Sequence, residues 1–339
     1  MQQATPSPPL LEVDALTVRY RARAGLVHAV SDVSFQLGQG ETLAIVGESG
    51  SGKSTTGLAI MGLLPTDRRT IVHGAIRLTS KSGSINDVLR LPDRERRRVR
   101  GNDVAMIFQD PMSSLNPIYS IGSQIVEAVR QHRHVARREA VADAMRLLAE
   151  LGVPSPDRIL ASYPHQLSGG MRQRVMIAIA LSCRPRALIA DEPTTALDVT
   201  IQAQILALLK RVQRETAMAV VFITHNLSVV AEVADRIVVM YAGRIVEAGP
   251  VRDVFKSPRM PYTLSLLRSL PRLDHLRRSG DPLEAIPGNV PNPLALPPGC
   301  TFHPRCPHQI AGICDGPIPR LERCAPNRLV RCARWREID

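Results

Sequence analysis

A glycine-rich segment, Gly47-Glu-Ser-Gly-Ser-Gly-Lys-Ser54, fits the pattern G-x-x-x-x-G-K-[ST]. Its glycines let backbone N–H groups turn toward phosphate oxygens, and a helix that follows presents its positive N-terminus to the same anion. Lys53 should reach the β- and γ-phosphates, and the Ser54 hydroxyl should bind Mg²⁺. The segment follows a short apolar run and precedes a helical pattern, which is the context that confirms the motif. It therefore predicts a site for a nucleoside triphosphate with Mg²⁺.

Two carboxylates, Asp191 and Glu192, follow the apolar run of residues 187–190. An Asp at the end of a buried strand can complete a Mg²⁺ shell, and the adjacent Glu can orient or deprotonate an attacking water. Alone, an Asp-Glu pair more often begins a helix. The phosphate loop lies about 140 residues upstream, as the numbering gives it, and together the two motifs favour the catalytic interpretation.

Three further features have residue types that suit phosphate chemistry. Gln109 ends the apolar run 104–108, and His225 follows the apolar run 220–224. A single Gln or His at the end of a strand is most often structural. The segment Leu167-Ser168-Gly169-Gly170-Met171-Arg172-Gln173 is a Ser-Gly-Gly turn that opens a helix, and this shape also suits a phosphate.

The elements that must position these residues alternate between strand and helix patterns. Val141, Met145 and Leu148 have the spacing of one apolar helix face. The predicted strands cover residues 11–20, 30–37, 42–46, 104–108, 187–190 and 220–224, with a hairpin of 236–241 and 244–247 that turns at Ala242-Gly243; the predicted helices cover 55–63, 175–181 and 201–215, and 111–169 is helical in texture. The alternation predicts an α/β fold with a parallel sheet and a helical insertion.

Composition excludes several classes of protein. The chain has 339 residues, with 43 Lys and Arg against 31 Asp and Glu, which gives a net charge of 43 − 31 = +12. This positive charge indicates either an anionic partner or simply a solvated basic surface. Aromatic residues are only 3%, which disfavours a stacking platform for bases. No apolar run has the length of a membrane helix, and the N-terminus lacks the pattern of a signal peptide. Residues 1–9 have no hydrophobic periodicity and are predicted to form an irregular N-terminal tail.

Taken together, these motifs resemble those of the nucleotide-binding subunits of ABC transporters. The phosphate loop, Gln109, the segment 167–173, Asp191-Glu192, the turn Ala196-Leu197-Asp198 and His225 occur in the family's order and at about its spacing, within residues 11–250. Two departures are small: Asn226 stands where the family usually has Asp, and Met171 where many members have Gln.

The resemblance implies a role for each site residue. Glu192 and His225 are the catalytic pair, and His225 contacts the γ-phosphate. Tyr20 stacks on adenine, and Gln109 joins Ser54 and Asp191 at Mg²⁺ and couples the metal to the membrane partner. The nucleotide-binding set is Tyr20, Gly47, Ser49, Gly50, Gly52, Lys53, Ser54, Thr55, Gln109 and Asp191; the set that acts in trans on a second ATPase is Leu167, Ser168, Gly169, Gly170, Gln173 and Asp198.

The same resemblance divides the chain into parts. Residues 10–110 and 171–255 form an ATPase core with an N-terminal β-subdomain, 111–170 an inserted helical subdomain, and 256–339 an irregular extension rich in Pro and Cys. Three segments of the extension, 260–267, 286–291 and 296–307, resemble the oligopeptide/dipeptide importer ATPases, as do 107–117 and 163–174. Members of that branch import peptides, and others import nickel complexes, glutathione or sugars.

Five of the six cysteines lie in the last 40 residues: Cys300, Cys306, Cys314, Cys324 and Cys332. In a cytosolic chain such a cluster suggests a metal site rather than disulfides. Some family members hold a [4Fe–4S] cluster through cysteines that match Cys300, Cys306, Cys314 and Cys332, and Cys324 is a possible alternative. Four thiolates also suit zinc, but no C-x-x-C pair is present, and free thiols remain a third interpretation.

The resemblance also implies partners and a location. It predicts an ATPase dimer, a heterodimer with a second ABC ATPase, on two transmembrane permease subunits fed by an extracytoplasmic substrate-binding protein. The chain would lie on the cytoplasmic face of the membrane, with ATP and Mg²⁺ bound and no nucleic acid expected. A soluble ABC ATPase of nucleic acid or ribosomes would use the +12 charge, but such proteins usually carry two of these domains or a long coiled coil. A module with an inactive ATPase is disfavoured by the intact Lys53, Asp191, Glu192 and His225.

Overall fold

The computed structural model describes residues 8–110, 114–195, 197–269 and 286–338. Several sequence-based expectations fall partly outside these ranges. They concern the first seven residues of the tail, the segment 111–113 after Gln109, Ala196 of the predicted turn, and the start of the proline-rich stretch at 281–285.

An eight-stranded sheet in the order β11-β12-β10-β9-β3-β8-β7-β6 forms the centre of the molecule. Its parallel part consists of β3 (Thr42–Val46), β6 (Val104–Ile107), β7 (Ala187–Asp191), β8 (Ala219–Thr224) and β9 (Arg236–Tyr241). β3 lies between β8 and β9 and pairs in parallel with both. All residues of β3, β6, β7 and β8 are buried, as strands covered on both faces require. The predicted parallel sheet is confirmed.

The predicted hairpin is also confirmed. β9 pairs antiparallel with β10 (Arg244–Pro250). The two turn residues both have positive φ, 45° at Ala242 and 77° at Gly243. Positive φ at both central positions is the geometry of a type I′ turn, whose twist matches that of the strands.

A second, antiparallel sheet has the order β2-β1-β4-β5. The sequence predicts β1 (Leu11–Ala22) and most of β2 (Gly25–Leu37), but not β4 (Thr70–Thr79) or β5 (Ile85–Asp87). Side chains of this sheet, such as Leu16 and Ile76, share one buried cluster with Ile45 of β3. The second sheet therefore packs against the part of the core that contains β3, the strand before the phosphate loop.

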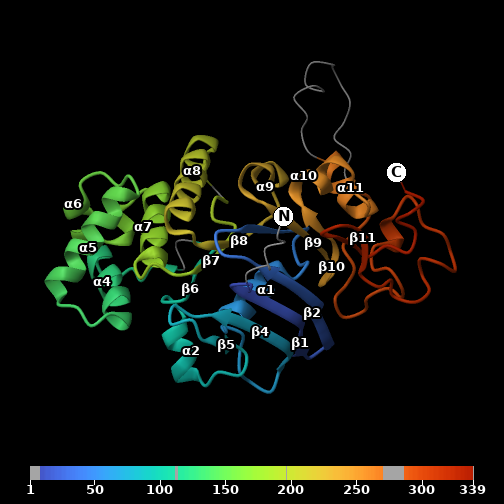
Figure 1. Cartoon of the computed structure of the whole chain (residues 1–339), viewed down its shortest axis with the longest axis horizontal. Coiled ribbons are helices and arrows are strands. Elements are labelled where there is room, and N and C mark those ends of the chain that lie inside the picture. The colour runs from blue at the N-terminus through green and yellow to red at the C-terminus, as the bar shows by residue number, and fades with distance from the viewer. Residues whose placement is uncertain (1–7, 111–113, 196, 270–285, 339) are drawn as a thin grey trace, which may run out of the picture.

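The helical insertion lies at one end of the long axis, drawn in green in Figure 1. It contains α4 (Ile121–His132), α5 (Arg137–Glu150), α6 (Pro156–Ala161) and the 3₁₀ turn η1 (Pro164–Gln166). The buried residues of α5 are Ala140, Ala144 and Leu148. The predicted apolar face is therefore partly wrong: Met145 is 38% exposed, because small alanines rather than the long side chain face α4.

Other helices connect the strands of the core. These are α1 (Lys53–Ile60), α2 (Asp93–Val99), α7 (Gly169–Leu181), α8 (Val199–Thr216), α9 (Leu227–Val233) and α10 (Val251–Lys256). Within the described ranges, no helix is long and apolar enough to cross a membrane.

The C-terminal extension lies at the opposite end of the molecule (Figure 1) and is more ordered than the sequence predicts. It contains α11 (Pro261–Arg268), the turn η2 (His303–Arg305), β11 (Glu322–Ala325) and β12 (Arg328–Val330). β12 pairs antiparallel with β10, so the extension continues the central sheet. Strands of three and four residues carry too little periodic signal to be found in the sequence.

Candidate active site

The phosphate loop connects β3 to α1, as the motif requires. Its glycines adopt positive φ: 151° at Gly47, 77° at Gly50 and 99° at Gly52. A Cβ on Gly47 would lie 2.1 Å from the Met240 carbonyl oxygen, and a Cβ on Gly52 would lie 2.4 Å from that of Ala29. Only glycine fits either position. A Cβ on Gly50 would meet no atom within 4 Å, so this glycine faces open space above the loop.

Lys53 is 6% exposed and its ammonium lies over the loop. The Nζ atom donates to the carbonyl oxygens of Gly47 at 2.8 Å and Glu48 at 2.9 Å. Burial lowers the pKa of Lys53, while the nearby carboxylates Glu192 and Asp191 act in the opposite direction. The lysine is thus placed between the loop and the carboxylates, where a polyphosphate would lie.

Asp191 ends β7 and lies next to Ser54. It is 5% exposed, and the Ser54 side chain is hydrogen-bonded to it. Burial raises the pKa of Asp191, and the negative charge of Glu192 adds to the rise. The Oδ1 atom is buried without a hydrogen-bond partner, and an unsatisfied buried carboxylate oxygen is costly unless a ligand completes it. A hydroxyl and a buried carboxylate oxygen are the hard ligands that Mg²⁺ takes, so the residues present fit this ion.

Glu192 is the centre of a network that joins three segments, those that follow β6, β7 and β8. Its carboxylate receives hydrogen bonds from Gln109 Nε2 at 3.1 Å, Thr195 Oγ1 at 2.8 Å and His225 Nδ1 at 2.9 Å. Burial raises its pKa, but the hydrogen bonds from His225 and Thr195 outweigh that effect and the net pKa is lowered. An ionised carboxylate can accept a proton from, or orient, a water beside it.

The backbone at Glu192 is also unusual. Its φ is 47°, a left-handed conformation that non-glycine residues rarely adopt. The Glu192 N–H donates to the Ile223 carbonyl at 2.8 Å, which fixes the peptide against the neighbouring strand. Strain of this kind persists where the surrounding structure determines it, and it aims the carboxylate at Gln109 and His225.

His225 follows β8 at the exposed rim of the site. Its side chain is 61% exposed, and Nδ1 is engaged with Glu192. With Nδ1–H donating to a carboxylate, Nε2 can donate to a further anion only when the ring is doubly protonated. Nδ1 is thus engaged inside the site, while most of the ring is exposed at its rim.

Tyr20 lies on β1, beside the start of α1. The Tyr20 side chain is hydrogen-bonded to that of Thr55, which follows the phosphate loop directly. Burial raises the pKa of Tyr20, and this hydrogen bond lowers it in part. Tyr20 therefore lies beside the helix that follows the phosphate loop.

The Ser-Gly-Gly turn begins α7, as predicted. Ser168 is the N-cap and accepts a hydrogen bond from the Met171 N–H at 3.4 Å. A Cβ on Gly169 would meet nothing within 4 Å, while one on Gly170 would lie 3.2 Å from Ile201 Cγ2 of α8. The turn therefore packs beside the first turn of α8, whose N-cap is Asp198. Val199, next to Asp198, is 83% exposed, and this end of α8 is open to a partner.

Gln173 differs from the rest of the predicted trans set. It is 3% exposed, and Nε2 donates to the Pro193 carbonyl, one residue after Glu192. Its side chain connects α7, the helix that begins at the Ser-Gly-Gly turn, to the segment that carries Glu192 in the same chain, and it does not face outward. Leu167 is also buried, at 7% exposure.

Sequence reasoning missed four residues that take part in the site: Thr195, Glu48, Arg305 and Tyr262. Thr195 holds Glu192, and a Ser or Thr three residues after a strand-end acid was the available signal. Glu48 lies within the phosphate loop and binds Arg305 and Tyr262 from the C-terminal extension. No sequence signal could pair these residues, because Arg305 is 257 positions from Glu48.

Four of the five C-terminal cysteines line one small cavity: Cys300, Cys306, Cys314 and Cys332. Burial, and then the other three thiols, raise the pKa of Cys332 to about 11. The cavity holds about 20 Å³, the room of about one water molecule. Within the part of the chain that the structure describes, no three His, Cys, Asp or Glu side chains are arranged to hold a metal ion. The four thiols fit a cluster in number and in chemical type.

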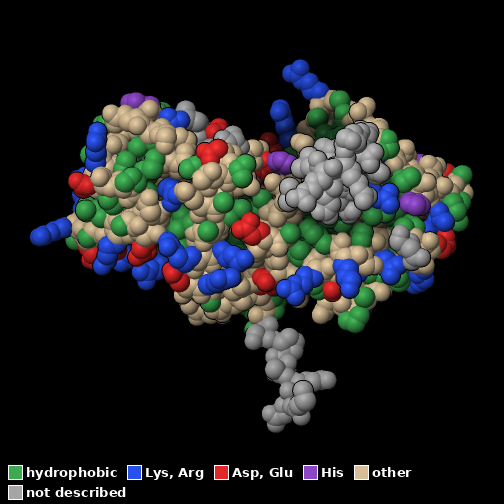
Figure 2. All heavy atoms as spheres, turned by 90° about the horizontal axis from the view of Figure 1, so that it is seen from above, with side chains coloured by type: hydrophobic (Ala, Val, Ile, Leu, Met, Phe, Trp, Pro, Cys, Tyr) green, Lys and Arg blue, Asp and Glu red, His purple; other side chains and the backbone are tan. Residues whose placement is uncertain are grey.

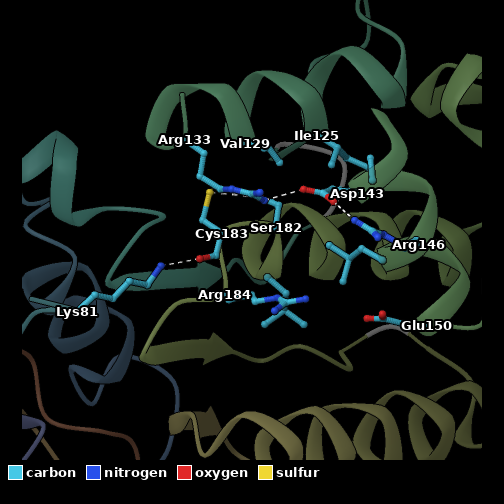
Figure 3. A pocket seen from close by; sticks show the side chains of 13 residues that line it. Lys81, Ile125, Val129, Arg133, Asp143, Arg146, Glu150, Ser182, Cys183 and Arg184 are labelled. Atoms are coloured by element: carbon cyan, nitrogen blue, oxygen red, sulfur yellow. Dashed lines mark hydrogen bonds and ion pairs between the residues drawn. The ribbon is translucent and has the colours of Figure 1, made fainter. Parts of the chain in front are cut away.

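Two cavities lie between the core and the helical insertion. The larger, of about 460 Å³, is lined by α4, α5 and the end of α7; there Arg133 and Arg146 both pair with Asp143, and Lys81 Nζ donates to the Cys183 carbonyl (Figure 3). The other, of about 200 Å³, is more apolar and includes Phe108, the residue before Gln109. Cys183 lines both cavities, so the two lie next to each other at the boundary between the core and the helical insertion.

Comparison with protein-family models identifies two regions. Residues 30–195 match the model described as ABC transporter, and residues 246–314 match the one described as oligopeptide/dipeptide transporter, C-terminal region.

Similar proteins cover the chain almost from end to end. A provisionally named peptide import ATP-binding protein of Brucella abortus is 52% identical over 97% of this chain and 98% of that protein. The oligopeptide transport ATP-binding protein OppD of Salmonella typhimurium is 49% identical over 98% and 95%, and the dipeptide transport ATP-binding protein DppD of Bacillus subtilis 48% over 95% and 94%. A dimeric ATP-binding cassette bound to ADP and phosphate is 28% identical with a TM-score of 0.62, over 71% of this chain and 99% of that one.

Proposed function

The chain belongs to the ABC transporter family, in the branch of the oligopeptide and dipeptide transport ATP-binding proteins, and we propose that it hydrolyses ATP to power the import of peptides. The observation that carries the proposal is the Glu192 network. It joins the catalytic carboxylate to Gln109, Thr195 and His225 beside a phosphate loop with its lysine in place.

In the proposed mechanism, the loop N–H groups, Lys53 and the N-terminus of α1 bind the phosphates of ATP. Ser54 and the free oxygen of Asp191 would hold Mg²⁺, which would supply positive charge to offset that of the β- and γ-phosphates. Glu192, ionised because its pKa is lowered, orients and deprotonates the attacking water. His225 contacts the γ-phosphate, while its Nδ1 holds the carboxylate in position.

We propose that the signature turn of this chain, formed by Ser168, Gly169 and Gly170, closes over the nucleotide that is bound by a second ATPase. The open space at Gly169 and the exposed Val199 beside Asp198 support a surface that is completed by a partner. The dimeric cassette among the solved structures is consistent with this arrangement. A heterodimer with a related ATPase is the form that we favour.

The partner in the membrane would bind at the boundary between the core and the helical insertion, at the more apolar of the two cavities there. Phe108 is 38% exposed and lines the apolar cavity there, and the next residue, Gln109, bonds Glu192. A helix of a permease subunit seated in this groove would therefore act on the catalytic carboxylate through two adjacent residues. Replacing Phe108 by Ser should weaken co-purification with the permease and leave ATP binding unchanged.

The remaining assignments extend the family relationship. We propose two transmembrane permease subunits, an extracytoplasmic substrate-binding protein and a position on the cytoplasmic face of the membrane. A nickel complex or glutathione is the alternative cargo. A role on nucleic acid would need a continuous basic surface, whereas on the face shown in Figure 2 Lys and Arg mix with acidic side chains.

Purification from membranes through a tag on this chain tests the function. The expected result is co-isolation of two channel subunits and an ATPase activity that peptides stimulate in the presence of the binding protein. Isolation without membrane proteins, together with salt-dependent binding to RNA or duplex DNA, would contradict it. If a nickel complex or glutathione stimulates the ATPase activity and peptides do not, the assigned substrate would change, but the assignment as an importer ATPase would stand.

We further propose that Cys300, Cys306, Cys314 and Cys332 hold a [4Fe–4S] cluster. The four thiols line one cavity, and in such a cluster each thiolate binds a different iron, so they need not converge on one point as zinc ligands must. A cluster would tie together a segment with little core of its own. Anaerobic purification with assays of iron, sulfide and zinc tests this: zinc alone, or no metal, would contradict it.

A further inference from the structure

Glu48 of the phosphate loop is bound by the C-terminal extension through both its side chain and its backbone. Arg305 Nη1 lies 2.7 Å from Glu48 Oε2, and Nη2 lies 3.0 Å from Oε1, a two-point ion pair. The Glu48 N–H donates to the Tyr262 hydroxyl of α11 at 2.9 Å. The Glu48 carbonyl accepts from Lys53. One loop residue thus joins the extension to the phosphate-binding lysine.

Arg305 is itself held firmly in place. It is 7% exposed, its Nε donates to the Pro287 carbonyl at 2.8 Å, and its Nη1 donates to the Tyr241 hydroxyl at 3.2 Å. Its guanidinium carbon lies 5.8 Å from the Tyr241 ring centroid and 6.0 Å from that of Phe302. These aromatic rings pack against Tyr262, so the arginine and the tyrosine that bind Glu48 share one rigid support. Little side-chain entropy remains to be lost on forming the ion pair.

The charge of Glu48 gives this ion pair a consequence for the nucleotide. A carboxylate inside a loop that binds a polyphosphate repels its ligand, and this repulsion is strong where the surroundings exclude water. The Arg305 guanidinium neutralises the carboxylate through a fork whose geometry matches its two oxygens. Without the arginine, Glu48 would be a partly buried, unpaired anion beside the phosphate site.

We propose that Arg305 is a positioning residue of the ATP site, by which the C-terminal extension neutralises and orients the phosphate loop at Glu48. The affinity of this chain for ATP then depends on the extension as well as on the ATPase core. The inference rests on the proposed function, because it concerns the same nucleotide site.

The test measures the dissociation constant of radiolabelled ATP by equilibrium dialysis, with the full-length chain. Arg305→Gln should weaken binding about tenfold, because it leaves the carboxylate uncompensated. The additional change Glu48→Gln removes that charge, so the double variant should bind within about threefold of wild type. The matched control is Arg334→Gln, which removes another extension arginine that bonds Glu337 and the His308 carbonyl but not the loop.

Rescue by the second change separates charge compensation from loss of structure. An Arg305→Gln variant that binds ATP like Arg334→Gln would overturn the inference, and so would a loss that Glu48→Gln does not relieve. If Arg305→Gln does not fold, the Arg305→Lys variant is tested in its place. A single ammonium group cannot bind both carboxylate oxygens as the guanidinium does, so ATP binding should weaken about threefold. Adding Glu48→Gln should then restore the affinity for ATP. Failure of the wild-type chain to bind ATP would overturn the proposed function itself.

Discussion

At the scale of single residues, the site depends on side chains that hold other side chains. Glu192 is aimed by three donors and by its own left-handed backbone, and Lys53 is placed by two loop carbonyls. Gln173 is the residue whose role changes most between sequence and structure. The family resemblance assigns it to the set that acts in trans on a second ATPase, whereas its amide donates to the Pro193 carbonyl inside the same chain.

Replacing Gln173 by Leu should separate ATP binding from turnover. The change leaves the buried Pro193 carbonyl without its donor, at a cost of about 1–3 kcal/mol, and loosens the segment that carries Glu192. We expect kcat of the transporter ATPase to fall about tenfold while the dissociation constant for ATP stays within about twofold. Gln131→Leu, on the exposed surface of α4, is the control and should alter neither quantity. Equal losses in binding and turnover would contradict a positioning role.

At the scale of elements, the ends of strands and the starts of helices form the site. β3, β6, β7 and β8 each lead into one of its functional residues, because parallel strands bring their carboxyl ends to one edge. α7 and α8 begin side by side, with Gly170 against Ile201. The open space at Gly169 and the exposed Val199 are our reasons for proposing that the signature turn meets a partner's nucleotide.

Val199→Asp tests the surface at the start of α8. Val199 is 83% exposed next to the N-cap Asp198, so a new carboxylate there should not disturb folding. It should oppose closure of two ATPases, because a like charge beside Asp198 would be desolvated in the interface. We expect transporter ATPase activity to fall about tenfold or more. Ile85→Asp, at a position 65% exposed on β5, introduces the same charge elsewhere and should have no effect. Equal activity of the two variants would place the dimer surface elsewhere.

At the scale of the whole molecule, the C-terminal extension is part of the ATPase body. β12 extends the central sheet through β10, and the fully buried Glu247 of β10 accepts from Arg328 at 2.9 Å and from the Arg259 and Met260 N–H groups. The Arg328 guanidinium makes this buried ion pair and also reaches the Ser257 carbonyl.

Arg328→Met should destabilise the whole chain. The substitution leaves Glu247 as a buried carboxylate without its cation, which should reduce the free energy of unfolding by about 3 kcal/mol. Adding Glu247→Gln removes the charge and keeps an acceptor for one of the two N–H groups, so the double variant should recover about half of the loss. Chemical unfolding followed by circular dichroism measures both. A single variant as stable as wild type would mean that the extension is not held through this pair.

The sequence predicted the parts of this molecule whose signals are local. The phosphate loop, its strand and helix, the signature turn and the type I′ hairpin each occupy a short continuous segment in which residue type decides backbone geometry. Contacts between distant segments were not predictable. The Arg305–Glu48 and Arg328–Glu247 pairs join positions far apart in the chain, and the three residues of β12 become a strand only because β10 offers an edge. Met145 was misplaced because packing, not hydrophobicity alone, selects the buried face of α5.

The central claim, that this chain hydrolyses ATP with Glu192, is tested most directly by nucleotide retention in a Glu192→Gln variant. The transporter is isolated through a tag on this chain, incubated with Mg²⁺ and radiolabelled ATP, and freed of unbound nucleotide. Glutamine preserves the size and the hydrogen bonds from Gln109 and Thr195 but cannot accept a proton from water. We predict that the variant retains uncleaved ATP and loses more than about 99% of its turnover at this site. Turnover equal to that of the wild type, with only ADP bound, would contradict the assignment.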